Sequence, residues 1–174
     1  ATPEGWPELT PVGKVELREY PVYRAAVVDQ TDIKGRGMNP MFWELFQHIK
    51  TNDIAMTAHV DMGYDDASPE NPRMTSMAFL YRTTSLGETG EQGAVEVVDV
   101  ERQLFASVGV RGGYNDATFE RGLDKLAAWL TEHNDEYIRT GPPRFLGYNG
   151  PMVPIFMRYG EVQMPVRPRE ADPE

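Results

Sequence analysis

The chain has 174 residues, enough for one domain that buries about two-thirds of its unfolded surface. Its formal charge of −10 would repel phosphate backbones and anionic lipid, so we expect no nucleic-acid partner. The absence of cysteine excludes disulfides, a thiolate nucleophile, cysteine-ligated zinc and iron–sulfur clusters. No run approaches the roughly 18 apolar residues of a membrane helix, which predicts a soluble protein without membrane insertion.

The two ends of the chain differ in composition from the rest. Residues 1–12, with three prolines, read as an extended, proline-stiffened lead-in, and residues 167–174 read as a polar tail. The start at Ala1 instead of methionine, together with the proline-rich opening, suits export, for example to a periplasm. A chain without thiols tolerates reducing and oxidising surroundings equally, so cysteine content does not indicate the cellular compartment.

The chain continues with a strand region and an amphipathic helix. Residues 15–28 are β-rich, and Pro21 marks an edge or bend within them. Residues 40–50, PMFWELFQHIK, predict a helix with Asn39 as its N-cap and Pro40 as its first residue. The apolar stripe of this helix, at spacing i, i+3, i+4 and i+7, consists of Phe42, Leu45, Phe46 and Ile49.

Strands and a second helix follow in the same order. Two strands are predicted on either side of a polar stretch, and a glycine-rich surface loop, SLGETGEQG, comes next. A second β-rich region then leads into a longer helix capped by Asn115 or Asp116, and two more strands close the chain. The strand regions are residues 54–62, 74–82, 95–112, 142–154 and 155–166, and the helix is residues 117–133.

The order β-α-β-β therefore occurs twice within a single domain, residues 1–174. The halves cover about residues 13–83 and 93–166. Helices alternating with antiparallel pairs indicate the α+β class. We expect two pseudo-symmetric repeats that form a distorted antiparallel β-barrel flanked by the two helices.

The three histidines are the candidate metal ligands. His59 shares a strand face with Asp61, which could orient its ring, but no second ligand stands at a metal-like spacing. His133 falls in the last turn of the second helix, where the helix dipole favours a histidine. His48 is expected on the solvent side of the first helix. We therefore predict no metal site, with His59 and His133 as the alternative ligands.

No enzyme motif is present, because the sequence lacks GxSxG, a P-loop and a GxGxxG after a strand. Glu161, with Tyr159 close by, is the alternative catalytic pair. A buried glutamate could act as a general base or hold a cationic ligand. The competing interpretation is a structural ion pair of Glu161 with Arg18 or Arg158. We expect a binding protein rather than an enzyme.

Three short motifs, in the same order, resemble the SOUL/haem-binding protein family over about residues 15–166. They are the E-x-R-x-Y-P-x-Y opening from Glu16 to Tyr23, the Met56-Thr57-Ala58 element, and GYNGPMVP followed by Glu161-Val162. The resemblance implies a fold related to gyrase-inhibitor-like effector-binding domains, which hold small molecules in the groove between their halves. A structural module whose groove is filled by its own side chains is a further alternative.

The resemblance also implies a ligand, which would be haem or another tetrapyrrole such as a porphyrin. It would lie on an apolar surface beside the first helix, without a fixed ligand motif. The family usually reads Met-Thr-Ala-Pro-Val where this chain has His59 in place of the proline, so His59 is not a family ligand. By position the surface would include Phe42, Leu45, Phe46 and Ile49, with Met56 as a neighbour, and Lys34 and Arg36 are expected to contact the propionates.

Overall fold

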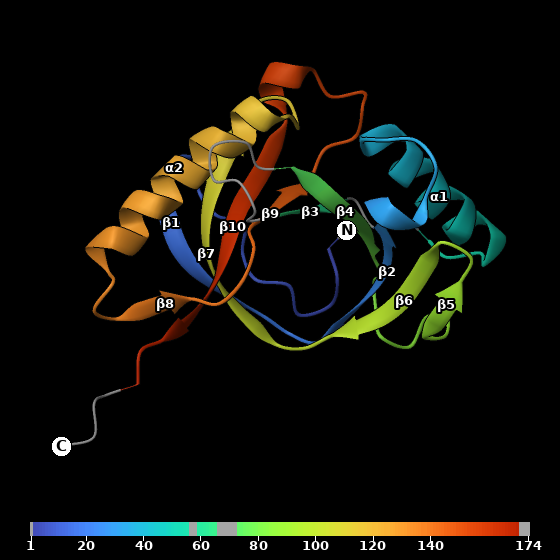
Figure 1. Cartoon of the computed structure of the whole chain (residues 1–174), viewed down its shortest axis with the longest axis horizontal. Helices are drawn as coiled ribbons and strands as arrows, with labels where there is room; N and C mark the ends of the chain where they lie inside the picture. The colour runs from blue at the N-terminus through green and yellow to red at the C-terminus, as the bar shows by residue number, and fades with distance from the viewer. Residues whose placement is uncertain (1, 56–58, 66–72, 171–174) are drawn as a thin grey trace.

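A computed structural model describes residues 2–55, 59–65 and 73–170 of the chain (Figure 1). The first half contains β1 (Val15–Tyr20), β2 (Tyr23–Asp29), η1 (Gln30–Asp32), α1 (Met38–Thr51), β3 (Val60–Tyr64), β4 (Met74–Leu80) and β5 (Gly90–Gln92). The second half contains β6 (Val95–Val100), β7 (Gln103–Arg111), α2 (Asp116–Glu132), β8 (Tyr137–Arg139), β9 (Arg144–Gly147), η2 (Ile155–Met157) and β10 (Tyr159–Pro168). No helix of the described part is long and apolar enough to span a membrane.

The strands form a ten-stranded antiparallel sheet in the order β1-β7-β10-β9-β3-β4-β2-β6-β5, with β8 paired to β10. The order β7-β10-β9 in one half mirrors β2-β4-β3 in the other, and the two halves meet where β9 pairs with β3. β1 and β6 are exchanged, because each pairs with the other half. The predicted α+β class with two repeats and two helices is therefore confirmed. The barrel is not, because the curved sheet of the described residues has ends at β1 and β5.

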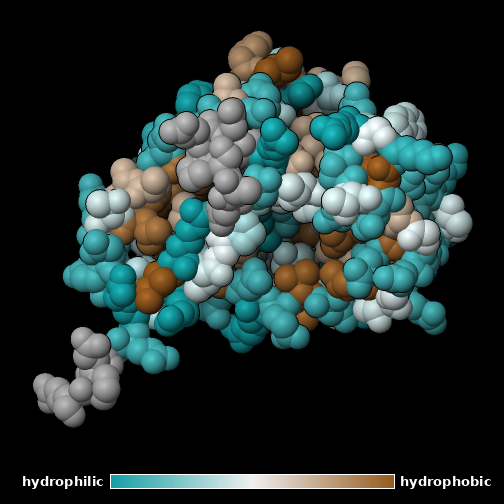
Figure 2. All heavy atoms as spheres, in the orientation of Figure 1, coloured by the Kyte–Doolittle hydropathy of each residue, from teal (hydrophilic) through white to brown (hydrophobic). Residues whose placement is uncertain are grey.

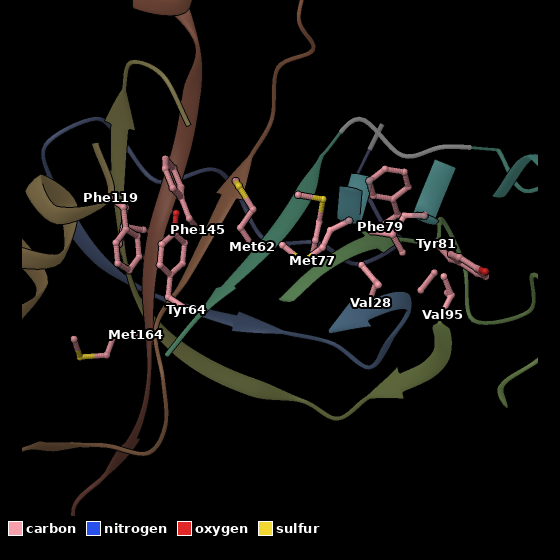
Figure 3. Close-up of a cluster of buried hydrophobic side chains, with 14 of the residues drawn as sticks. Val28, Met62, Tyr64, Met77, Phe79, Tyr81, Val95, Phe119, Phe145 and Met164 are labelled. Carbon is pink, nitrogen blue, oxygen red and sulfur yellow. The ribbon is translucent and has the colours of Figure 1, made fainter. Parts of the chain in front are cut away.

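Both helices pack on the same face of the sheet, which we call the outer face. The main apolar core lies between them and this face, and Figure 3 shows part of it. Phe119 of α2 stacks on Tyr64 of β3, with ring centroids 3.8 Å apart. The opposite face of the sheet, which we call the inner face, carries a second apolar cluster of Tyr20, Tyr23, Ala25, Ala78, Leu80 and Phe105.

Helix α1 begins two residues before the predicted start. Its N-cap is Gly37, with φ 94°, and not Asn39, because the loop enters the helix in a conformation that favours glycine. Pro40 still lies in the first turn, where its missing N–H removes no helical hydrogen bond. The predicted cap of the second helix is confirmed, since the Asn115 side chain accepts a hydrogen bond from the Thr118 N–H at 3.0 Å.

The buried stripe of α1 differs from the predicted one. It consists of Met41, Leu45, His48 and Ile49. The prediction of a solvent-facing His48 is wrong, because its Nε2 lies 2.9 Å from the Tyr81 hydroxyl. Met41, omitted from the predicted stripe, turns the buried face of the helix towards His48 at the i+7 position.

Two further expectations about strand regions are corrected. The loop SLGETGEQG is not entirely loop, because Gly90–Gln92 pairs with β6 as β5. The strand expected over residues 54–62 begins only at Val60, and residues 56–58 lie outside the described part.

Gly122 lets α2 approach β10 closely. A Cβ atom at position 122 would lie 2.5 Å from Val162 Cγ2 and 2.7 Å from Val162 Cβ. Alanine normally favours a helix, yet we expect Gly122→Ala to lower the free energy of unfolding by about 1–3 kcal/mol, because the helix must move off the sheet. Urea unfolding followed by circular dichroism measures this change.

Gly150→Ala is the matched control for this prediction. The added Cβ atom would have no heavy atom within 4 Å, so we expect a free energy of unfolding within about 0.5 kcal/mol of the unsubstituted protein. Equal stability of the Gly122 and Gly150 variants would contradict the close approach of α2.

Candidate functional site

The inner face of the sheet carries charged and polar side chains as well as the second apolar cluster. Along β10, Val162 and Met164 belong to the outer core, whereas Glu161 and Gln163 make their hydrogen bonds on the inner side. This alternation is the two-residue period of a strand. Arg144 at the start of β9 joins them by donating to Gln163. These charged and polar residues therefore lie on the face of the sheet away from both helices.

A pocket of about 760 Å³ opens on the inner face. This volume lies within the range of about 300–1,000 Å³ that is usual for small-molecule sites. Its described lining includes three arginines, Arg102, Arg144 and Arg167, and a single acidic residue, Asp61. The lining is therefore locally positive in a chain of charge −10. The apolar part of the lining includes Val27, Ala78, Leu104, Pro142 and Pro143.

Arg144 connects the pocket to the interior of the inner face. Its guanidinium donates to Asp61 Oδ2 at 3.1 Å and to the Tyr23 hydroxyl at 2.8 Å. The guanidinium carbon lies 3.9 Å from the centre of the Phe105 ring, a cation–π contact. Burial disfavours the charge, but Tyr23 and Asp61 outweigh it and raise the pKa of Arg144. Nη2 has no hydrogen-bond partner among the described residues, so one buried donor is left over.

Glu161 lies on the inner face but outside the pocket lining, and it is 1% exposed. Its Oε2 accepts from the Thr10 N–H at 2.9 Å and the Thr10 hydroxyl at 2.5 Å, and from Ser107 at 3.1 Å. Its Oε1 accepts a hydrogen bond from the Tyr148 hydroxyl. Burial, and secondly the negative charge of Glu161, raise the pKa of Tyr148, so this phenol keeps its proton. The carboxylate is held by hydroxyls and an amide.

The alternative ion pair of Glu161 with Arg18 or Arg158 is wrong. Arg18 pairs with Glu16 at 2.5 Å, and the Arg158 guanidinium donates to backbone carbonyls. Tyr159 does not reach Glu161 as a described hydrogen-bond partner, because its hydroxyl donates to the Thr10 carbonyl. The predicted pair of Glu161 and Tyr159 is therefore joined indirectly, through Thr10 and through Tyr148, whose ring lies 5.5 Å from that of Tyr159.

His59 is also fully buried on this side of the sheet, at 0% exposure. Its ring stacks on Tyr148 with centroids 4.9 Å apart, and Trp6 lies 5.1 Å away. Neither ring nitrogen has a hydrogen-bond partner among the described residues. Asp61 does not orient the ring as the sequence suggested, because its carboxylate binds Arg144. Burial, and secondly the nearby Arg144, lower the pKa of His59 to about 4. The imidazole is therefore neutral at physiological pH.

The other histidines have structural contacts. His133 is the C-cap of α2, and its Nδ1 donates to the Trp129 carbonyl at 2.8 Å, as the sequence position suggested. His48 is buried against Tyr81, and burial lowers its pKa. No group of three or more histidine, cysteine, aspartate or glutamate residues in the described ranges could hold a metal ion.

The predicted ligand surface beside α1 is only partly at the surface. Leu45 and Ile49 are buried in the outer core, whereas Phe46 is 36% exposed and stacks on Phe42 with centroids 6.2 Å apart. Lys34 and Arg36 are exposed in the loop before the helix. Met56 lies outside the described residues. An exposed aromatic patch of Phe46 and Trp43 is therefore what α1 offers to a ligand.

Another exposed apolar patch lies around η2, where brown spheres mark the top of the molecule in Figure 2. Met152 and Phe156 are the most exposed of its side chains, at 93% and 75%. Neither belongs to the pocket lining, so this patch and the pocket are separate features.

Sequence reasoning missed four residues of the inner face: Trp6, Thr10, Arg144 and Tyr148. Arg144 carried a usable signal, because it is a charge within the apolar run PPRFLG at a strand position. Trp6 and Thr10 had no recognisable signal in the sequence, since their partners lie far away in the chain and a proline-rich segment is usually solvated. Only the tertiary structure brings them to Glu161 and His59.

Comparisons with known proteins identify the fold and the family. The model for the family described as SOUL heme-binding protein matches residues 7–165. No curated protein matches significantly.

Among solved structures, the EcmrR C-terminal domain aligns with a TM-score of 0.63 and 15% identity, over 88% of this chain and 97% of that chain. A hydrolase from Listeria innocua aligns with a TM-score of 0.59 and 12% identity, over 91% and 94% of the two chains. The protein SAV2435 bound to tetraphenylphosphonium aligns with a TM-score of 0.51 and 10% identity, over 88% and 94%. At these identities the likeness shows the fold alone, so the assignment rests on the family model: the chain belongs to the SOUL heme-binding protein family.

Proposed function

We propose that this protein binds a planar, apolar small molecule that carries carboxylates, and that a tetrapyrrole such as haem or a porphyrin is the first candidate. Family membership supports the ligand class. The single observation that carries the proposal is the pocket of about 760 Å³, whose lining combines apolar walls with three arginines and one aspartate. Apolar walls bury a macrocycle, and guanidinium groups bind carboxylates with directed hydrogen bonds.

The residues of the pocket have distinct proposed roles. Arg102 and Arg167 are exposed and would contact the carboxylates at the pocket edge. Val27 and Leu104 would pack against the ring system. The described lining contains no histidine, methionine or cysteine, and burial raises the pKa of its tyrosines Tyr23 and Tyr64, which disfavours the phenolate that iron would bind. We therefore propose that recognition depends on the carboxylates and the ring rather than on iron. The surface beside α1, with Phe42, Phe46, Lys34 and Arg36, is the competing location.

Matched charge reversals distinguish the two locations. We expect Arg102→Glu/Arg167→Glu to weaken haemin binding at least about tenfold, because two cations at the pocket edge become anions facing the propionates. Lys34→Glu/Arg36→Glu makes the same change of charge at the start of α1 and should alter the affinity less than about twofold. Titration followed by the Soret band measures both.

Metal-free protoporphyrin provides a second comparison for the same titration. It should bind with an affinity within about threefold of that of haemin if iron makes no contact with the protein. Loss of binding in the Lys34/Arg36 variant alone would move the ligand to the α1 surface. Absence of any spectral change with either compound at micromolar protein would reject the tetrapyrrole as ligand.

A further inference from the structure

The exposed apolar patch around η2 is formed by one short segment, residues 150–157, which we call the tip. It lies at the top of the molecule in Figure 1, close to the start of α2. Four of its side chains are exposed by half or more: Met152 93%, Ile155 60%, Phe156 75% and Met157 52%. Single exposed apolar residues are common on protein surfaces, whereas four within six consecutive positions form a patch of the kind that contacts a partner.

Two arginines hold the backbone of the tip. The Arg158 guanidinium donates to the carbonyls of Val153 at 3.0 Å and Pro151 at 3.2 Å. Arg111, at the end of β7, donates through Nη1 to the Met157 carbonyl at 2.7 Å. The apolar side chains are therefore presented to solvent by a segment whose backbone is hydrogen-bonded to its surroundings.

Most backbone carbonyls of the tip have partners for this reason. Six of its eight carbonyls accept a hydrogen bond from a described residue, namely those of Gly150, Pro151, Val153, Pro154, Ile155 and Met157. Pro151 and Pro154 carry no N–H that would need an acceptor. Unpaired backbone groups are costly to remove from water, so this pairing lowers the cost of placing the tip in an apolar phase.

Three arginines lie at the base of the tip: Arg111, Arg121 and Arg158. Arg121 is linked to Arg111, because its Nη2 donates to the Arg111 carbonyl at 3.3 Å. Asp116 and Glu120 lie on the first two turns of α2, yet none of the three arginines forms an ion pair with an acidic residue of the described part. Guanidinium groups that are free of carboxylates bind phosphate oxygens with directed hydrogen bonds.

From the apolar side chains, the paired backbone and the unpaired cations we propose that the tip docks the protein on a lipid bilayer that contains anionic lipid. The side chains of Met152, Ile155 and Phe156 enter the boundary between headgroups and acyl chains, and the arginines contact lipid phosphates. A protruding tip enters a deformable lipid phase without needing the matching cavity that a protein partner would have to supply. The tip lies outside the pocket lining, so the proposal does not depend on the ligand of the pocket.

The formal charge of −10 opposes this docking at long range. Charges more than about 10 Å from the contact are largely screened at physiological salt, so the three arginines beside the tip outweigh the distant carboxylates. The expectation from total charge therefore does not apply to this end of the molecule. Only side chains enter the lipid, so the docking needs no helix that spans the membrane.

Flotation of the full chain with vesicles of phosphatidylcholine and phosphatidylglycerol in equal parts tests the proposal. We expect Met152→Ser/Phe156→Ser to lower the partition coefficient at least about tenfold, because two exposed apolar side chains no longer enter the lipid. The matched control is Leu9→Ser/Val22→Ser, which changes two apolar residues that are 45% and 42% exposed and should have less than about a twofold effect. Equal losses in the two variants, or no flotation of the unsubstituted protein, would overturn the proposal.

A second comparison tests the arginines. Arg121→Gln should lower the partition coefficient about fivefold, whereas Arg82→Gln, which removes the same charge at an exposed position outside the tip, should lower it less than about twofold. Vesicles of phosphatidylcholine alone should bind the unsubstituted protein at least about tenfold more weakly than the mixed vesicles. Equal binding to both kinds of vesicle would overturn the assignment to anionic lipid.

Sedimentation of the free protein distinguishes a bilayer from a second copy of this chain as the partner of the tip. We expect the same sedimentation coefficient for the unsubstituted protein and for Met152→Ser/Phe156→Ser. Both substituted side chains are exposed, so the far-UV circular dichroism of this variant should also be unchanged. A dimer that the two substitutions dissociate would show that the tip joins copies of the chain, and would overturn the proposal.

Discussion

Replacing Arg144 with methionine is expected to lower the free energy of unfolding by about 3–5 kcal/mol. The substitution removes the guanidinium that neutralises Asp61 and leaves this carboxylate on the inner face without its ion-pair partner. It also removes the donors to Tyr23 and Gln163. Urea unfolding at neutral pH, followed by circular dichroism, measures the effect.

Two controls separate the loss of a buried partner from the loss of a charge. Arg102→Met breaks the ion pair of Arg102 with Glu19, in which the two side chains are 70% and 62% exposed. We expect this to change the free energy of unfolding by less than about 1 kcal/mol. Combining Arg144→Met with Asp61→Leu removes the stranded carboxylate and should recover part of the lost stability. A double variant that is less stable than Arg144→Met alone would contradict the explanation by an uncompensated charge.

Acidification is expected to destabilise the protein through His59. Burial and Arg144 hold its pKa in the folded state at about 4, whereas an unfolded chain gives about 6.5. Between these values the unfolded state binds more protons, so the free energy of unfolding falls as the pH falls. The contribution of this single group amounts to about 2.5 kcal/mol between about pH 7.5 and about pH 4.5.

Comparison with His59→Leu isolates this contribution, because the other titrating groups are common to both proteins. We expect the variant to be at least as stable as the unsubstituted protein at neutral pH, since two unpartnered ring nitrogens are removed from the interior. On acidification to about pH 4.5, the free energy of unfolding of the variant should fall by about 2.5 kcal/mol less than that of the unsubstituted protein. Parallel pH profiles of the two proteins would refute the assignment to His59.

The sequence correctly predicted those helices and strands that are encoded by neighbouring residues, through caps and apolar spacing. Helix α2 was predicted within one residue of its start and end, because Asn115 caps it and its apolar spacing is regular. The doubled order of strands and helices was also predicted, because strand and helix periods alternate visibly along the chain. The stripe of α1 was misplaced by the omission of Met41, because aromatic residues at neighbouring positions define two overlapping stripes. Periodicity cannot choose between such stripes without knowledge of the facing sheet.

The functional surfaces depend on contacts between residues that are distant in sequence. Glu161 was selected from the sequence as a candidate, but Thr10, its partner, lies 151 positions away. Arg144 and Tyr23, which meet on the inner face, are 121 positions apart. The pairing of β9 with β3, which joins the two halves, places Arg144 opposite Gly63 and within reach of Asp61.

The sequence by itself therefore determined the family, the α+β class, the repeat and the position of the second helix, because each is encoded in neighbouring residues or short motifs. The tertiary structure alone decided that His59 is buried, that residues 3–12 lie inside the curved sheet (Figure 1), and that the cationic pocket lies opposite the helices. The physical reason is that strand pairing sets which side chains face each other, and pairing is specified by packing across the whole sheet.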